Sequence, residues 1–274
     1  MIAVFGSSGT LGRAIRRLVG EGKFHTREDW DLRTLRGIRR FLHDFLEGSE
    51  AVINAAAYTD VDGAEREPVL AFRINAQFPK VLAQVCREAN VKLIHLSTDY
   101  VFDGEVGYYY EDDPPQPRSV YGKSKLLGEM YVLEEYPEAM VVRTSWIFGE
   151  GGRNFFSRLP LKLLAGETVF AHDLQTSSPT YAPFLARILL RMLEEDLPGG
   201  IYHITGKLPL TPFDGAILLA DELNSTSRIV RSVPEGFMDI RPRSSVLLSS
   251  RYAYPMPSFI DSVRDYLATV KSLP

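Results

Sequence analysis

The sequence has little cysteine, no long apolar run and no excess of basic charge, and each shortage excludes a class of protein. Its 274 residues include a single cysteine, Cys86, so no intramolecular disulfide framework can form. No stretch approaches the roughly 18 apolar residues that a transmembrane helix needs. The formal net charge is −4, whereas nucleic-acid-binding domains usually present a basic surface. The five histidines lack the spacing typical of zinc ligands, so we expect no metal site. Together with the two preceding shortages, this predicts that neither nucleic acid nor a membrane is a partner.

The chain opens with residues 1–6, a short apolar run that is followed by Arg13, Arg16 and Arg17. The run is too short for the apolar region of a signal peptide, so it is predicted to be a first core strand. We therefore expect a cytoplasmic protein. Cys86 falls on an apolar helical stripe, which predicts a buried packing residue.

The first half of the chain alternates short apolar runs with longer helical patterns. This order predicts an α/β fold of the Rossmann-like, doubly wound kind, with a parallel sheet covered by helices. Pro79 predicts a kink in the second long helix. The predicted strands span residues 2–5, 23–26, 51–56, 91–97 and 139–144, and the predicted helices span 10–18, 69–89 and 120–134.

The rhythm is less regular after about residue 146. Helical patterns cover residues 154–165, 181–194, 212–224 and 258–272, and short strands are predicted over 168–171, 201–205 and 229–232. We expect residues 1–150 to form one domain and residues 151–274 to form mainly a smaller mixed region. The helix and strand within 181–205 are expected to return to the sheet of the first domain.

Three glycines, Gly6, Gly9 and Gly12, lie between the first strand and the first helix. Glycines here permit a tight turn and close helix packing, and the N–H groups at the helix start can then face a pyrophosphate. The spacing predicts a dinucleotide-binding loop, although a plain strand-to-helix turn would also use glycine. Residues 1–150 are therefore predicted to be an NAD(P)-binding domain.

The residue that would select between NAD and NADP is ambiguous. Arg27 follows the short second strand and could meet a 2′-phosphate, or it could be a solvated surface charge. Asp29 and Asp31 could instead bind a ribose or cap a helix. Both NADPH and NADH therefore stay open as cofactors.

Tyr121 and Lys125 are four residues apart in a predicted helix, so they share one face. An ammonium beside a phenol favours the phenolate and lowers the pKa of the tyrosine. Such a pair can exchange a proton with a carbonyl or an alcohol. A packed tyrosine beside a solvated lysine would show the same spacing. The strand that ends at Thr98 favours the catalytic interpretation, because ligands bind at the carboxyl ends of parallel strands.

These motifs resemble the extended branch of the short-chain dehydrogenase/reductase superfamily and, within it, the dTDP-4-dehydrorhamnose reductase family. The most specific match is the run Ser-Thr-Asp-Tyr-Val-Phe-Asp-Gly at 97–104. The other matching positions are 54–59, 61–62, 64–65, 67–68, 121–122 with Lys125, 143–146, 154–155, 178–181 and 241–242.

The resemblance implies an oxidoreductase of dTDP-rhamnose biosynthesis, which supplies a sugar for cell-surface polysaccharide. Tyr121 would donate a proton to the C4 carbonyl of the nucleotide sugar, Lys125 would lower its pKa and hold the nicotinamide ribose, and Thr98 would bind the reacting oxygen. The implied cofactor-binding residues are Gly6, Gly9, Thr10, Leu11, Gly12, Asp31, Leu32, Ala57, Tyr58, Thr59, Leu96, Tyr121 and Lys125. The implied substrate-binding residues are Val61, Thr98, Asp99, Tyr100, Trp146 and Arg241. A homodimer is compatible with the family.

Two segments on the substrate side depart from the family pattern. Residues 174–177 read Leu-Gln-Thr-Ser where the family has Asp-Gln-x-Gly, and residues 244–248 lack an expected Asn and Asp. These changes put the exact sugar nucleotide in question. Arg241 and Arg243 could meet a diphosphate or form surface ion pairs.

Two other functions compete with a reductase. A sugar-nucleotide dehydratase would carry Asp-Glu after Thr98, whereas this chain has Asp99 and Tyr100, which disfavours dehydration and leaves epimerisation open. A non-catalytic subunit, like the regulatory subunit of methionine adenosyltransferase, would keep the fold and bind a dinucleotide. The complete set of Thr98, Tyr121 and Lys125 favours an enzyme.

Overall fold

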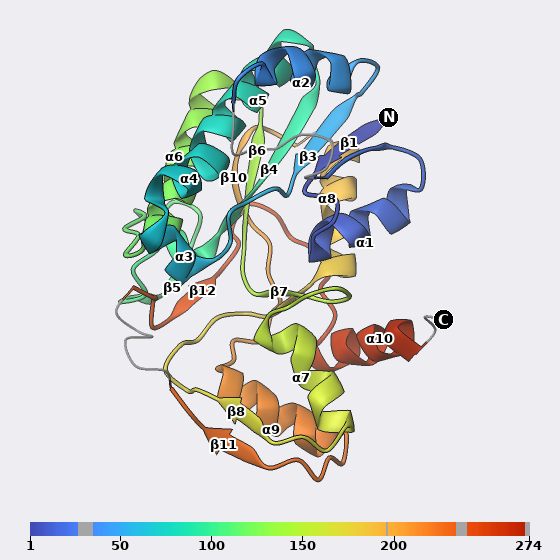
Figure 1. Ribbon diagram of the computed structural model, residues 1–274, viewed down its shortest axis with the longest axis vertical. Coiled ribbons are helices and arrows are strands. Elements are labelled where there is room, and N and C mark those ends of the chain that lie inside the picture. The colour runs from blue at the N-terminus through green and yellow to red at the C-terminus, as the bar shows by residue number, and fades with distance from the viewer. Residues whose placement is uncertain (27–34, 196, 234–239, 272–274) are drawn as a thin grey trace.

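The computed structural model describes residues 1–26, 35–195, 197–233 and 240–271. Figure 1 shows a larger lobe built on one sheet and a smaller lobe beneath it that contains α7 (Phe155–Leu164) and α9 (Pro212–Glu222). The chain passes between the two lobes several times, so neither lobe is a single continuous stretch of sequence.

The large lobe contains six parallel strands in the order β10-β6-β4-β3-β1-β2. The chain builds outward from β1 in both directions, which confirms the predicted doubly wound α/β sheet. The strands are β1 (Ile2–Phe5), β2 (Lys23–His25), β3 (Ala51–Asn54), β4 (Lys92–Thr98), β6 (Met140–Thr144) and β10 (Gly200–His203).

Helices cover both faces of this sheet, with α1 and α8 together on one side (Figure 1). Because successive strand residues point to opposite faces, Val4 joins the core beneath α1 and α8, whereas Ala3 and Phe5 join the core of the other face. Cys86 is fully buried in that second core, as predicted. The helices are α1 (Thr10–Val19) and α8 (Ala182–Glu194) on one face, and α2 (Ile38–Leu46), α5 (Phe78–Glu88) and α6 (Val120–Glu135) on the other.

The helix predicted over 69–89 is divided by a wider π-helical turn, Arg73–Gln77, between α4 (Pro68–Phe72) and α5. The interruption precedes Pro79, which has no N–H to donate to the carbonyl of Asn75 four residues earlier. The predicted kink therefore takes the form of a π turn. A short helix not expected from the sequence, α3 (Val61–Arg66), precedes it.

The small lobe packs α7, α9 and α10 (Phe259–Lys271) around an aromatic core with Phe148 and Phe156. Beside them β8 (Val169–Ala171) pairs in parallel with β11 (Ile229–Arg231). Every helix within the described residues is too short or too polar to span a lipid bilayer.

Two further strand pairs join segments that are distant in sequence, and the sequence did not predict them. β5 (Gly107–Tyr109) pairs with β12 (Ser245–Leu247), and β7 (Ile147–Phe148) pairs with β9 (Thr180–Tyr181). Segments of two or three residues carry too little periodicity to be recognised alone. The residues 181–205 supply α8 and the edge strand β10, so the chain does return to the large sheet.

Candidate active site

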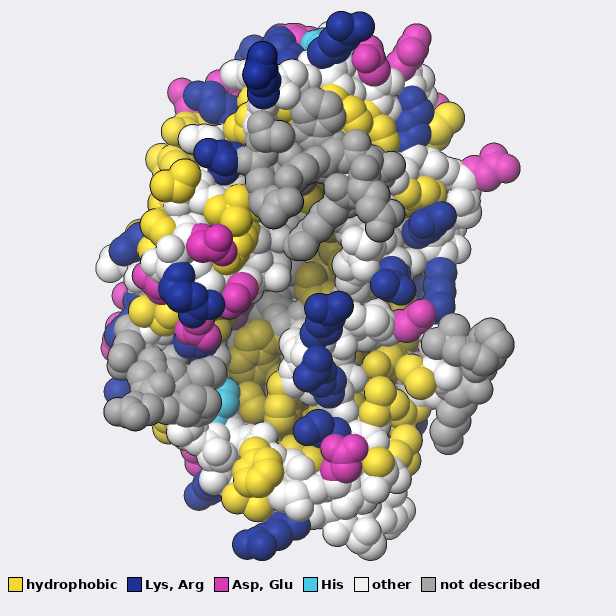
Figure 2. All heavy atoms as spheres, viewed as in Figure 1, with side chains coloured by type: hydrophobic (Ala, Val, Ile, Leu, Met, Phe, Trp, Pro, Cys, Tyr) yellow, Lys and Arg dark blue, Asp and Glu magenta, His cyan; other side chains and the backbone are white. Residues whose placement is uncertain are grey.

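The carboxyl ends of β1, β3, β4 and β6 meet at the side of the sheet that faces the small lobe (Figure 1). Figure 2 shows the surface hollowed between the lobes, with hydrophobic side chains on the floor of the hollow. Ligands of doubly wound sheets bind outside the carboxyl ends of the strands. The predicted site residues from all these strand ends therefore have one common place to act.

The glycine loop brings backbone groups close together at the start of α1. A Cβ atom on Gly12 would lie 2.2 Å from the carbonyl oxygen of Gly6, and a Cβ on Gly6, whose φ is +77°, would lie 2.7 Å from the backbone of Ala55. Only glycine fits these two positions. The first-turn N–H groups of α1, including those of Thr10 and Leu11, have no carbonyl partner within the helix. They form a cradle whose chemistry fits a pyrophosphate.

The segment after β3 is fixed by a side chain that the sequence did not single out. Asn75, in the π turn, accepts a hydrogen bond from the Tyr58 N–H at 2.8 Å and donates to the Tyr58 carbonyl at 3.0 Å. It also donates to Ser124 on α6 at 2.9 Å. In the sequence, the signal is a polar residue within a predicted helix. The structure shows that this residue, Asn75, is fully buried. Ala57 and Thr59 flank the position held in this way.

Four residues from the sequence analysis, Arg27, Asp29, Asp31 and Leu32, lie outside the described residues.

Lys125 is buried behind the strand ends and not at the surface. Its ammonium donates to the Leu96 carbonyl at 2.6 Å and lies 3.4 Å from Nε2 of His95. His95 in turn lies 3.0 Å from the Asn54 amide, through its Nδ1. Burial lowers the pKa of Lys125 to about 8, while the nearby Glu129 acts in the opposite direction. His95 is a second site neighbour that spacing alone could not reveal.

Tyr121 enters the site from the first turn of α6, which Ser119 caps by accepting the Gly122 N–H at 3.0 Å. Lys125 is not among the groups that shift the pKa of Tyr121 here, so its expected lowering of that pKa stays a prediction. Burial raises the pKa of Tyr121, the charge of Asp99 raises it further, and a hydrogen bond with Thr98 acts in the opposite direction. Apart from burial, the groups that shift the pKa of Tyr121 therefore lie at or just beyond the carboxyl end of β4.

Asp99 follows Thr98 and is 1% exposed. Its carboxylate accepts hydrogen bonds from Ser177 at 2.8 Å, from Ser245 at 2.6 Å and from Thr98 at 3.2 Å. Burial raises the pKa of Asp99 to about 6, and these hydroxyl donors hold it below a still higher value. The departing segments 174–177 and 244–248 thus both reach this carboxylate.

Tyr100 continues the same turn. Its ring and that of Tyr121 form a T-shaped pair with a centroid distance of 5.6 Å. Gln175 donates to the Tyr100 hydroxyl at 2.9 Å. Burial raises the pKa of Tyr100 to about 12, and the charge of Asp99 acts in the same direction. The tyrosine is therefore a neutral, fixed wall of the site.

The remaining predicted substrate residues come from both lobes. Trp146 has a φ of +38° and stacks on Phe156 at 5.4 Å between ring centroids. Val61 is the first residue of α3, and its neighbour Asp62 accepts a hydrogen bond from Arg241 at 2.6 Å. This contact is an ion pair, which we expected as the alternative to a diphosphate contact. The Arg241 side chain is only 9% exposed, so the arginine is buried.

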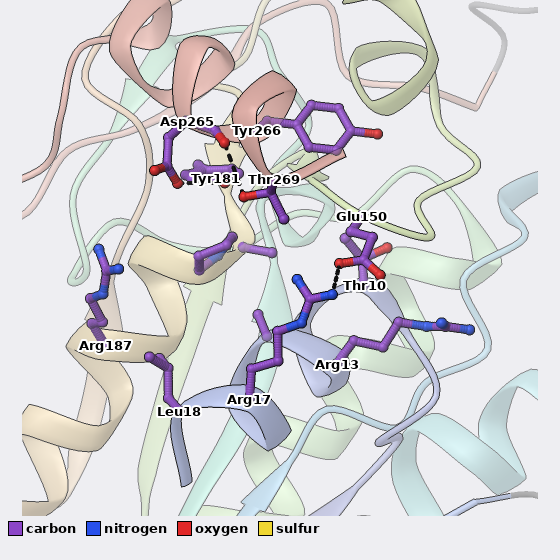
Figure 3. Close-up of a pocket in the computed structure, with 13 residues that line it drawn as sticks. Thr10, Arg13, Arg17, Leu18, Glu150, Tyr181, Arg187, Asp265, Tyr266 and Thr269 are labelled. Atoms are coloured by element: carbon purple, nitrogen blue, oxygen red, sulfur yellow. Dashed lines mark hydrogen bonds and ion pairs between the residues drawn. The ribbon is translucent and has the colours of Figure 1, made fainter. Parts of the chain in front are cut away.

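A separate pocket of about 220 Å³ lies between α1, α8 and α10 (Figure 3). Arg13, Arg17 and Arg187 line it, and Arg17 is paired with Glu150. Thr10 is the one predicted cofactor residue on its wall. The pocket is therefore distinct from the Thr98, Tyr121 and Lys125 site. Within residues 1–26, 35–195, 197–233 and 240–271, no group of three or more His, Cys, Asp or Glu side chains could hold a metal ion.

Comparison with known proteins gives a consistent family. The family model described as RmlD substrate binding domain matches residues 1–271. The dTDP-4-dehydrorhamnose reductase of Mycobacterium tuberculosis is 35% identical over 286 residues, covering 100% of this chain and 93% of the relative. The enzyme of that name from Streptomyces griseus is 41% identical over 215 residues, covering 73% of this chain and 69% of the relative.

Solved structures agree with this match. The crystal structure of dTDP-4-dehydrorhamnose reductase from Bacillus anthracis in complex with NADP has a TM-score of 0.87 and 27% identity, and covers 98% of both chains. The protein therefore belongs to the family of dTDP-4-dehydrorhamnose reductases.

Proposed function

We propose that the protein is an NADPH- or NADH-dependent reductase that converts dTDP-4-dehydrorhamnose to dTDP-rhamnose. Relatives with that name match the chain over nearly its whole length, and one of the structures that it resembles holds NADP. The observation that carries the proposal is that Thr98, at the carboxyl edge of the sheet, lies near enough to Tyr121 to lower its pKa, with Lys125 buried behind the same edge.

Gly6 and Gly12 let the loop pack directly against the chain's own backbone, and this tight turn would bring a dinucleotide pyrophosphate to the start of α1. The N–H groups at the start of α1 would hold the pyrophosphate, and residues 57–59 and Lys125 would lie along the nicotinamide half. When bound, the reduced nicotinamide supplies a hydride. The net charge of −4 means that such an anionic ligand is held by local donors and not by the overall field of the protein.

The protein's own residues supply the proton. Burial keeps the Tyr121 phenol protonated at neutral pH, which is the form that a proton donor to a carbonyl requires. Thr98 holds the phenol oxygen in place. The positive charge of the Lys125 ammonium would stabilise the negative charge that develops on the Tyr121 oxygen when the proton leaves.

The test is a direct assay of NADPH or NADH oxidation with dTDP-4-dehydrorhamnose, followed by the loss of nicotinamide absorbance. We expect turnover by the native chain and a loss of at least about 100-fold in kcat for Tyr121→Phe, because the proton donor is removed. Tyr108→Phe is the matched control, because Tyr108 is 55% exposed on β5 and should leave kcat unchanged.

Other 4-keto-6-deoxy nucleotide sugars are assayed alongside, because segments 174–177 and 244–248 depart from the family pattern. Dinucleotide binding without turnover of any of them would overturn the reductase and favour a non-catalytic subunit. Full activity in Tyr121→Phe would overturn the proton-donor role. Cytoplasmic location and a homodimer remain predictions, to be checked by cell fractionation and light scattering.

A further inference from the structure

We propose that Ser177 and Ser245 are positioning residues that act through Asp99. They hold its carboxylate ionised next to Thr98, so that the Thr98 hydroxyl points its proton toward Asp99 and its oxygen can accept the Tyr121 O–H. This inference rests on the proposed reductase function and adds a determinant of the proton step that lies outside the Thr98, Tyr121 and Lys125 set.

The geometry joins three separate segments at one carboxylate. Asp99 lies just beyond β4, Ser177 lies in the segment before β9, and Ser245 begins β12. Both serine hydroxyls donate to the same oxygen, Oδ2, at 2.8 and 2.6 Å, while the Thr98 hydroxyl donates to Oδ1 at 3.2 Å. An ionised carboxylate only accepts hydrogen bonds, so all three hydroxyl protons must point toward it.

The Thr98 hydroxyl has a single proton, and two neighbours compete for it. When Asp99 is ionised the proton is donated to Asp99, and the Thr98 oxygen accepts the Tyr100 N–H at 3.2 Å and keeps a second lone pair that the Tyr121 O–H can use. When Asp99 is neutral, Thr98 can donate to the Tyr121 oxygen instead, which favours the phenolate. The buried phenol stays protonated at neutral pH in both cases, so the charge of Asp99 decides which way the Thr98 hydroxyl points toward it.

The surroundings explain why the serines matter. Within the described parts of the chain, no basic side chain forms an ion pair with Asp99, so hydroxyl donors must compensate its buried charge. The titratable groups that face it are Tyr100 and Tyr121, and the Arg241–Asp62 pair lies beyond Tyr100. Burial raises the pKa of Asp99 to about 6, which is close enough to neutrality for the loss of one donor to change its charge.

Two substitutions test the donor at position 177. Ser177→Gly and Ser177→Ala both remove the hydroxyl and leave the carboxylate in place.

The first experiment follows the Asp99 carboxyl carbon by ¹³C NMR in the full chain as pH is varied, with Asp99→Asn to assign its signal. We expect a midpoint near 6 in the native protein. Ser177→Ala should raise the midpoint by about one unit, and Ser177→Ala with Ser245→Ala by about two, because each removes a hydrogen bond to the charged form. Ser262→Ala is the control, because Ser262 is a buried serine on α10 that donates to a backbone carbonyl.

The second experiment follows the tyrosine ring carbon of Tyr121, assigned with Tyr121→Phe. Asp99→Asn should lower the titration midpoint of Tyr121, because the competing acceptor and its charge are removed. These two readouts do not depend on substrate turnover, so they test the inference even if the assays show no reductase activity.

The third readout is the pH profile of kcat/KM. At pH 7 a midpoint raised by one unit leaves about half of Asp99 ionised, and one raised by two units leaves about a tenth. We expect kcat/KM to fall about twofold in Ser177→Ala and about tenfold in the double variant, with recovery at higher pH and unchanged dinucleotide binding. An Asp99 midpoint that is the same in the double variant and the native protein would overturn the inference. So would a shifted midpoint with an unshifted pH profile in an active enzyme.

Discussion

Burial moves the ionisable side chains of the site toward their neutral forms. The pKa of Lys125 is lowered to about 8, that of Asp99 is raised to about 6, and that of Tyr121 is raised. The spacing of Tyr121 and Lys125 correctly placed them on one helix, but it could not predict the burial that sets their pKa values. At the scale of the residue, the environment and not the pairing decides the protonation state.

Replacing Lys125 by methionine tests its role. We expect Lys125→Met to reduce kcat/KM by at least about 100-fold and to weaken dinucleotide binding, because the buried positive charge near Leu96 is lost. Lys123→Met is the control, since Lys123 is an exposed neighbour on the same helix. Steady-state kinetics and dinucleotide titration measure both effects, and native kinetics in Lys125→Met would contradict the assignment.

A buried ion pair next to the site provides a test of stability. Arg143 on β6 donates to Glu129 on α6 through Nη2 at 2.7 Å and Nε at 3.0 Å, and the two side chains are only 1% and 2% exposed. Removing one partner strands the other charge in the core, so Glu129→Ala should cost about 3–5 kcal/mol in the free energy of unfolding. Asp44→Ala, in an exposed pair with Arg40, should cost less than about 1 kcal/mol. Urea unfolding that gave equal losses would contradict this account.

At the scale of the element, long periodic segments were predictable and short paired ones were not. The helices α1, α7 and α8 were expected within one or two residues of their bounds, because an apolar stripe over ten or more residues has a clear period. The bounds of α6 were expected equally closely, although it buries mostly glycine and polar residues and has no such stripe. The strands β5, β7, β9 and β12 have two or three residues each and exist through their partners. The π turn that contains Asn75 was not predicted for the same reason, because it depends on contacts with Tyr58 and Ser124, which are distant in sequence.

The contact between the π turn and α6 leaves no room for a side chain at Gly128. A Cβ there would lie 2.1 Å from the Asn75 carbonyl oxygen. Gly128→Ala should therefore destabilise the fold by about 1–3 kcal/mol and weaken dinucleotide binding, because Asn75 fixes the Tyr58 backbone. Met130→Ala on the same helix is the control, with a residue 59% exposed. A Gly128→Ala variant as stable as the native protein in urea would refute the packing argument.

At the scale of the whole molecule, residues far apart in sequence hold the substrate side to the sheet. The pairing of β12 with β5 brings the C-terminal segment back to the large lobe. Arg241 reaches Asp62 across 179 positions. Glu111 accepts hydrogen bonds from the His203 N–H at 3.2 Å and from Ser249 at 2.9 Å, which links the edge strand β10 to the segment after β12.

The buried His203 at this junction predicts how stability depends on pH. Burial lowers the pKa of His203 from 6.5 to about 4, and the nearby Arg143 acts in the same direction. Between these values the unfolded chain binds a proton that the folded protein excludes, so stability falls as the pH decreases from 6.5 toward 4. The contribution of Asp99, with its raised pKa, has the opposite sign between 3.8 and about 6.

The contribution of His203 is therefore measured by difference. Urea unfolding at a series of pH values should show a smaller loss of stability in His203→Gln than in the native protein between pH 6.5 and 4. His43→Gln, at an exposed histidine, is the control. Parallel pH dependences in the native protein and His203→Gln would contradict the prediction.

The sequence by itself determined the parallel α/β fold, the glycine loop, the shared helix face of Tyr121 and Lys125, and the place of Thr98 at a strand end. These features depend on local periodicity and on short spacings, both of which can be read from neighbouring residues without knowledge of the tertiary structure. Only the tertiary structure decided what surrounds them. The serines on Asp99, the His95 beside Lys125 and the ion pair of Arg241 join residues that are 30 or more positions apart, and the burial that they create sets the charge of each group.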